Sequence, residues 1–60
     1  MTNDPIYTIL AVDDARDTLM LIDFDLTEHG YKVITAESGE AAFEQLSEHE
    51  VDLILLDIYM

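Results

Sequence analysis

The stretch Val51 to Asp57 sets four consecutive aliphatic side chains, Leu53 to Leu56, directly before a carboxylate. An apolar run this short, with no polar alternation, favours a parallel strand covered on both faces over an alternating edge strand. In open α/β sheets the carboxyl ends of the strands are where ligands bind. Asp57 is therefore the first candidate for chemistry in this chain.

Two further strands and two helices are predicted before this run. Residues Tyr7 to Val12 form an apolar, β-rich segment that the pair Asp13-Asp14 ends abruptly. Residues Ala15 to Glu28 follow a helical period, which places Leu19, Ile22 and Leu26 on one face. The pair His29-Gly30 predicts the end of this helix at a left-handed glycine.

Residues Tyr31 to Ala36 are predicted to form a second strand, and Lys32 within it suits a sheet edge. Ser38 is a plausible N-cap of a second helix that runs to His49. The order is thus β-α-β-α-β. It predicts an α/β fold with a parallel sheet and right-handed crossovers.

The charge of the chain limits the partners that it can bind. Fourteen acidic residues against Arg16 and Lys32 give a net charge of −12, which repels nucleic acid and anionic lipid and suits cations and basic surfaces. There is no cysteine, which fits a reducing cytosol. The N-terminus lacks a signal-peptide pattern, and no apolar run reaches the ~20 residues of a membrane span. We therefore expect a cytoplasmic domain without a membrane segment.

Three carboxylates follow predicted strands: Asp13, Asp14 and Asp57. If the first and third strands are neighbours, these groups share one pocket, where two like charges 4 Å apart repel by about 4 kcal/mol at an effective dielectric of 20. A divalent cation such as Mg²⁺ offsets that repulsion and takes oxygen ligands. A carboxylate beside Mg²⁺ can also act as the nucleophile that forms an aspartyl phosphate.

At these positions the chain resembles the receiver domain of two-component response regulators. The matching features are the strand ending in Val12-Asp13-Asp14, His29 to Tyr31, Ala36 to Glu40, and Asp52 to Met60. The resemblance implies the flavodoxin-like fold, whose strand order begins 2-1-3. It covers essentially the whole chain. Family members are about twice as long, so residues 1–60 correspond to the N-terminal half of a receiver domain.

The resemblance also implies the roles of the site residues. Asp57 is expected to be the phosphoacceptor, and the phosphoryl donor is a phosphohistidine on a sensor histidine kinase or a histidine phosphotransfer protein. Mg²⁺ is expected to bind Asp13, Asp14 and Asp57, together with the backbone carbonyl of Tyr59. Such a chain is a signalling domain in a phosphorelay and not an enzyme that turns over a small substrate. No residue here can be assigned the roles of the family's later Ser or Thr and Lys.

Simpler interpretations remain open for each of these residues. Asp13 and Asp14 can merely cap the first helix, and Asp57 can be an ordinary turn residue. Four further acidic residues read as a solvated surface: Asp17, Asp23, Asp25 and Asp52. Met20 and Phe24 lie off the predicted inner face of the first helix, where they either pack against a neighbouring helix or form a docking patch for a partner helix.

Two other functions compete with the phosphoacceptor role. One is a self-associating half-receiver whose acidic pocket is vestigial, because the half-domain lacks the family's Lys and its Ser or Thr. If the chain is really this short, its third strand has no further neighbour and is an open edge. We expect a homodimer or higher oligomer in that case, with Val51 to Leu56 at or near the interface and with association strengthened by salt or Mg²⁺. The other is a Mg²⁺-dependent phosphohydrolase, which is disfavoured because no second acid follows Asp57 by two residues.

Overall fold

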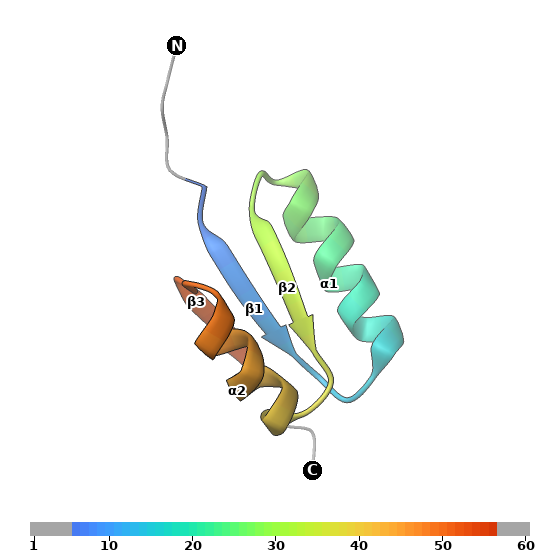
Figure 1. Ribbon diagram of the computed structural model, residues 1–60. Coiled ribbons are helices and arrows are strands. Elements are labelled where there is room, and N and C mark those ends of the chain that lie inside the picture. Colours follow the sequence, from blue (N-terminus) through green and yellow to red (C-terminus); the bar gives the residue numbers. More distant parts are fainter. Residues whose placement is uncertain (1–5, 57–60) are drawn as a thin grey trace.

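A computed structural model describes residues 6–56 of the chain. The strand β1 (Thr8–Val12) lies at the centre of its sheet and pairs in parallel with β2 (Lys32–Ala36) and with β3 (Leu53–Leu56). The resulting strand order is β2-β1-β3, as Figure 1 shows. This observation confirms the flavodoxin-like order that the family resemblance implied.

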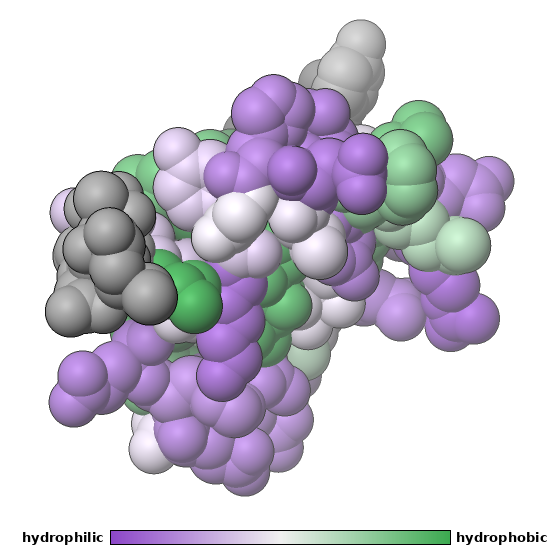
Figure 2. Space-filling model, turned by 90° about the horizontal axis from the view of Figure 1, so that it is seen from above, coloured by the Kyte–Doolittle hydropathy of each residue, from purple (hydrophilic) through white to green (hydrophobic). Residues whose placement is uncertain are grey.

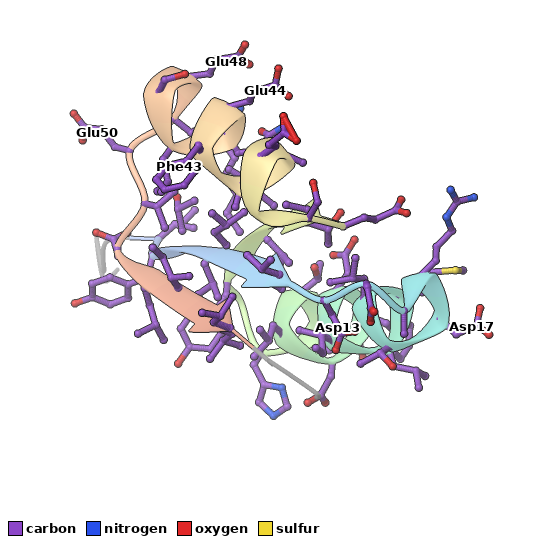
Figure 3. The ribbon with its side chains drawn as sticks, turned by 90° about the horizontal axis from the view of Figure 1, so that it is seen from below. Asp13, Asp17, Phe43, Glu44, Glu48 and Glu50 are labelled. Atoms are coloured by element: carbon purple, nitrogen blue, oxygen red, sulfur yellow. The ribbon has the colours of Figure 1, made fainter. Side chains whose placement is uncertain are left out.

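One helix covers each face of the sheet. The helix α1 (Arg16–Glu28) packs on β2 and β1, and α2 (Gly39–Glu48) packs on β2 and β1 from the opposite side (Figures 1 and 3). Each helix follows a strand directly, so both are the crossovers that the β-α-β-α-β pattern predicts. The molecule therefore has three layers, with the sheet in the middle.

The ends of both helices follow their predicted signals. The hydroxyl of Ser38 accepts a hydrogen bond from the backbone N–H of Ala41 at 3.1 Å, so Ser38 caps α2. After α1, Gly30 takes a φ of +92° and donates its N–H to the carbonyl of Thr27 at 3.0 Å. Tyr31 donates to the carbonyl of Leu26 at 3.1 Å, which completes a Schellman motif.

The core lies on both faces of β1. On the α2 face, Leu10, Val12 and Ala36 are buried and form one cluster. On the α1 face, Leu19 is buried, whereas Ile22 and Leu26 are half-buried. These observations confirm the predicted inner face of the first helix. Four partly buried hydrophobic residues pack against the cluster of Leu10, Val12 and Ala36: Ile34, Ala41, Ala42 and Val51.

Strand β3 is much less covered than its sequence predicts. Its four side chains are between 37 and 59% exposed. The expectation of a strand covered on both faces is therefore wrong for the described residues, because α1 packs on β2 and β1 and because α2 stands away from β3 across a hollow. Within residues 6–56, β3 is an edge strand whose one neighbour is β1.

Polar and large hydrophobic side chains share the surface: twelve large hydrophobic residues among residues 6–56 are at least 36% exposed. In the view of Figure 2, hydrophobic residues show between larger groups of hydrophilic ones. Lys32 is exposed on the edge strand β2, as its charge predicted. Neither helix of the described residues is long and apolar enough to cross a membrane.

Candidate functional site

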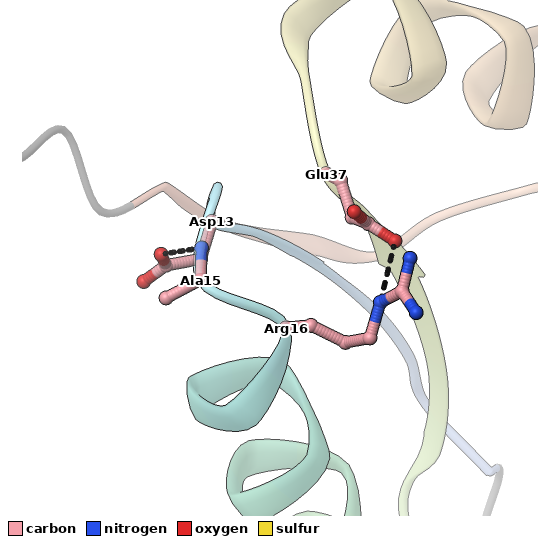
Figure 4. Close-up of polar contacts among 4 residues, drawn as sticks. All are labelled: Asp13, Ala15, Arg16 and Glu37. Carbon is pink, nitrogen blue, oxygen red and sulfur yellow. Dashed lines mark hydrogen bonds and ion pairs between the residues drawn. The ribbon is translucent and has the colours of Figure 1, made fainter.

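Asp13 lies at the carboxyl end of β1 and is the one buried charged residue among residues 6–56, at 7% exposure. Its backbone N–H donates to the carbonyl of Ala36 at 3.1 Å, which joins the end of β1 to the end of β2. Its Oδ1 accepts a hydrogen bond from the backbone N–H of Ala15 at 2.8 Å (Figure 4). The carboxylate is thus fixed against the turn that leads into α1, with its second oxygen outside this contact.

The helix-capping interpretation of Asp13 is therefore partly correct. Ala15 is the N-cap residue of α1, and its own side chain makes no capping hydrogen bond. Asp13 satisfies the N–H of Ala15 from two residues upstream, in the manner of an Asx turn. Asp14, in contrast, is exposed. Because only Oδ1 of Asp13 makes this structural contact, the other carboxylate oxygen is available as a ligand.

The register of the sheet places the ends of two strands side by side. Val12, the last residue of β1, pairs with Leu56, the last residue of β3. Asp13 and Asp57 are the next residues in the sequence after these two. Asp57 and Tyr59 lie outside the described residues, so their predicted roles remain predictions. Within residues 6–56, no group of three or more His, Cys, Asp or Glu side chains is placed to hold a metal ion.

Comparison with known proteins identifies the family. The model of the response regulator receiver domain matches residues 9–60. The chain belongs to the response regulator receiver family. Receiver domains are signalling domains of two-component systems and are not enzymes for small molecules.

Individual relatives agree with this assignment. The chain is 40% identical over 60 residues to the transcriptional regulatory protein GlrR of Escherichia coli, which covers all of this chain and 13% of that protein. It is 40% identical over 52 residues to the alkaline phosphatase synthesis transcriptional regulatory protein PhoP of Bacillus subtilis, covering 87% of this chain and 22% of that protein. The chain thus spans less than a quarter of either relative.

A solved structure gives the same fold. The chemotaxis protein CheY4 of Vibrio cholerae superposes with a TM-score of 0.88 at 30% identity, over 93% of this chain and 47% of CheY4. The receiver chain therefore spans about half the length of this structural relative. The agreement supports the strand order of the sheet.

An ion pair beside the site was not predicted from the sequence. Nε of Arg16 lies 3.4 Å from Oε2 of Glu37, and the pair links the start of α1 to the turn after β2 (Figure 4). Both side chains are more than half exposed, so the pair contributes little to stability. Arg16 is one of two cations in the sequence and lies two residues after the acidic pair, but no sequence signal singles out Glu37 as its partner.

The outer side of α1 carries an exposed apolar patch formed by Met20 and Phe24, which are 64 and 70% exposed. The expectation that they pack against a neighbouring helix is not met among the described residues. The two side chains line an open hollow of about 430 Å³ together with Asp23, Thr27 and Glu28. The receiver chain thus offers an apolar patch with acidic neighbours on α1, the helix that follows Asp13 and Asp14.

Proposed function

We propose that this receiver chain accepts a phosphoryl group on Asp57 from a phosphohistidine, as one step of a cytoplasmic phosphorelay. The observation that carries the proposal is the buried Asp13 at the carboxyl end of β1, together with the pairing of Val12 with Leu56. This pairing supports one shared site for the acidic residues that follow the two strands. Membership of the receiver family supports the phosphoacceptor role.

In the proposed reaction, a carboxylate oxygen of Asp57 attacks the phosphorus atom. The bond between phosphorus and the imidazole nitrogen breaks, and the leaving imidazole takes up a proton. Asp13 and Asp14 would hold Mg²⁺ together with Asp57 and the backbone carbonyl of Tyr59. These oxygen donors fit that ion, since Asp13 keeps one carboxylate oxygen outside its contact with Ala15. When bound, Mg²⁺ supplies positive charge that offsets the negative charge of the site and of the phosphoryl group.

The phosphodonor is proposed to be a sensor histidine kinase or a histidine phosphotransfer protein. A donor that delivers its phosphoryl group to the carboxyl edge must also contact the elements that border this edge. The patch of Met20 and Phe24 is exposed on α1, which begins at that edge, and Asp23 and Glu28 lie beside it. We expect the donor to present an apolar helix face flanked by basic residues.

Labelling with an acyl phosphate tests the phosphoacceptor role. We expect a Mg²⁺-dependent phosphate on the chain that is labile to acid and base. The Asp57→Asn variant should lose it. The matched control is Asp17→Asn, which changes an exposed carboxylate in the first turn of α1. A label that persists in Asp57→Asn would show that another carboxylate is the acceptor.

A second candidate function is self-association with a vestigial acidic pocket. The observation that favours it is the exposure of all four side chains of β3. Failure of any acyl phosphate to label the chain, combined with a stable oligomer, would favour this function over the first.

A further inference from the structure

Two contacts hold Asp13 at the carboxyl edge of the sheet, and each joins it to a different turn. Its Oδ1 accepts the backbone N–H of Ala15 at 2.8 Å, in the turn that leads into α1. Its own backbone N–H donates to the carbonyl of Ala36 at 3.1 Å, at the end of β2. The orientation of this carboxylate therefore depends on how the two turns lie relative to each other.

The ion pair of Arg16 with Glu37 joins the same two turns. Arg16 follows Ala15 directly in the sequence. Glu37 likewise follows Ala36. Nε of Arg16 lies 3.4 Å from Oε2 of Glu37, so the residues next to the two partners of Asp13 are themselves in contact (Figure 4). The three contacts form a closed ring, which runs from Asp13 through one turn, across the ion pair and back through the other turn.

We propose that Arg16 and Glu37 are positioning residues, which keep the carboxylate of Asp13 in the orientation that binds Mg²⁺. This inference rests on the metal site proposed above and names the residues that set its geometry. The ion pair need not stabilise the whole fold to act in this way. Both its side chains are more than half exposed, and a pair of this kind changes an equilibrium constant by a factor of about five at most. A bias of that size between two orientations of one carboxylate changes a dissociation constant measurably.

Charge alone predicts the opposite effect for Arg16. Its guanidinium is a positive charge beside a site for a cation, so its removal strengthens Mg²⁺ binding if charge is its only contribution. If Arg16 instead holds the two turns around Asp13, its removal weakens binding. The sign of the change therefore separates a positioning role from a purely electrostatic one. The other cation of the chain, Lys32, offers a matched control, because it lies at the opposite end of β2 from Ala36.

Isothermal titration calorimetry with Mg²⁺ tests the proposal. Arg16→Gln and Lys32→Gln each remove one positive charge, and we expect Arg16→Gln to bind Mg²⁺ about threefold more weakly than Lys32→Gln. The double variant Arg16→Glu with Glu37→Arg keeps the net charge of −12 and can form the pair again, so it should regain the affinity of the wild type.

Three results of this titration would overturn the proposal. One is binding by Arg16→Gln that equals or exceeds that of Lys32→Gln. Another is a double variant that binds as weakly as Arg16→Gln, because the pair would then be formed without effect. The third is a wild-type chain that binds no Mg²⁺.

Hydrogen exchange of the metal-free chain gives a second measurement, which does not depend on Mg²⁺. We expect the backbone amides of Asp13 and Ala15 to exchange about threefold faster in Arg16→Gln than in Lys32→Gln, because both amides belong to the ring. The amides in the middle of β1 and the urea midpoint should stay unchanged, which separates local loosening from loss of the fold. Unchanged exchange of both ring amides would count against the positioning role alone. Failure of Asp57 to take up phosphate would count against the proposed function alone.

Discussion

Thr8 and Asp52 bind each other twice across the start of the sheet. The backbone N–H of Thr8 donates to Oδ2 of Asp52 at 2.7 Å, and the backbone N–H of Asp52 donates to the carbonyl of Thr8 at 2.8 Å. Asp52 is exposed, as expected of an acidic surface residue, but its carboxylate also aligns the first residue of β1 with the segment that enters β3. The pair therefore sets the register that brings Val12 opposite Leu56.

Replacement of Asp52 should destabilise the fold. Asp52→Ala removes the acceptor of the Thr8 N–H, and at this exposed position we expect a cost of about 1 kcal/mol in the free energy of unfolding. Asp52→Asn keeps an acceptor oxygen without the charge and should cost less. Urea unfolding of the three proteins measures the difference. Equal stability of the alanine variant and the wild type would show that water replaces this acceptor at no cost.

Asp13→Asn should weaken Mg²⁺ binding while the fold is kept. The asparagine Oδ1 can still accept the N–H of Ala15, but the site loses one negative charge. We expect the dissociation constant for Mg²⁺ to rise by about tenfold or more, measured by isothermal titration calorimetry. Asp17→Asn, in the first turn of α1, is the matched control and should bind as the wild type does. Equal affinity of the Asp13 and Asp17 variants would rule out Asp13 as a ligand.

Gly30→Ala should destabilise the chain through its backbone alone. Gly30 has a φ of +92°, and a Cβ added there would meet no atom within 4 Å. The left-handed conformation costs an L-residue about 1–2 kcal/mol, so we expect a loss of that size in urea unfolding. Gly39→Ala is the control, since a Cβ there also meets no atom within 4 Å and Gly39 has no positive φ. It should be neutral or stabilising by up to about 1 kcal/mol.

Phe24→Ala should slow phosphotransfer from a protein donor and leave labelling by an acyl phosphate unchanged. Phe24 is 70% exposed, so its removal leaves the core of the receiver intact. A phosphorylated histidine phosphotransfer protein serves as the donor in a rapid-quench measurement of the transfer rate. Phe43→Ala, an equally exposed change on α2, is the control. Equal rates for the two variants would place the docking surface away from the α1 patch.

Local signals predicted the elements and their order well. The aliphatic runs, the cap Ser38 and the terminal Gly30 fixed each strand and helix to within one or two residues. Leu19, Ile22 and Leu26 were placed on the inner face of α1 because helical periodicity is a property of neighbouring residues. The strand order was predicted too, but through family resemblance, since parallel pairing depends on contacts between distant segments.

The open edge of β3 was among the expectations, but the exposure of both its faces and the partners of single carboxylates were beyond sequence reasoning. The hydropathy of Leu53–Leu56 indicates how strongly these residues favour burial. How exposed they are in the fold depends on where α1 and α2 pack. The contacts of Asp13 with Ala15 and of Asp52 with Thr8 depend on side-chain directions set by the finished backbone. The acidic pair at Asp13 was found because of its position after a strand. The ion pair of Arg16 with Glu37 had no comparable signal.

The central position of β1 means that folding requires both β2 and β3 to pair with it. Its partner β2 follows after one helix, whereas β3 follows after two helices and a further strand. Each doubling of the length of a loop adds only about 0.6 kcal/mol to the entropic cost of closing it. We therefore expect the pairing of β3 with β1 to be delayed by the sparse coverage of β3 rather than by its distance along the chain. We therefore expect β1, α1 and β2 to form the nucleus during synthesis. The amides that join β3 to β1 should be the first of the sheet to exchange with solvent.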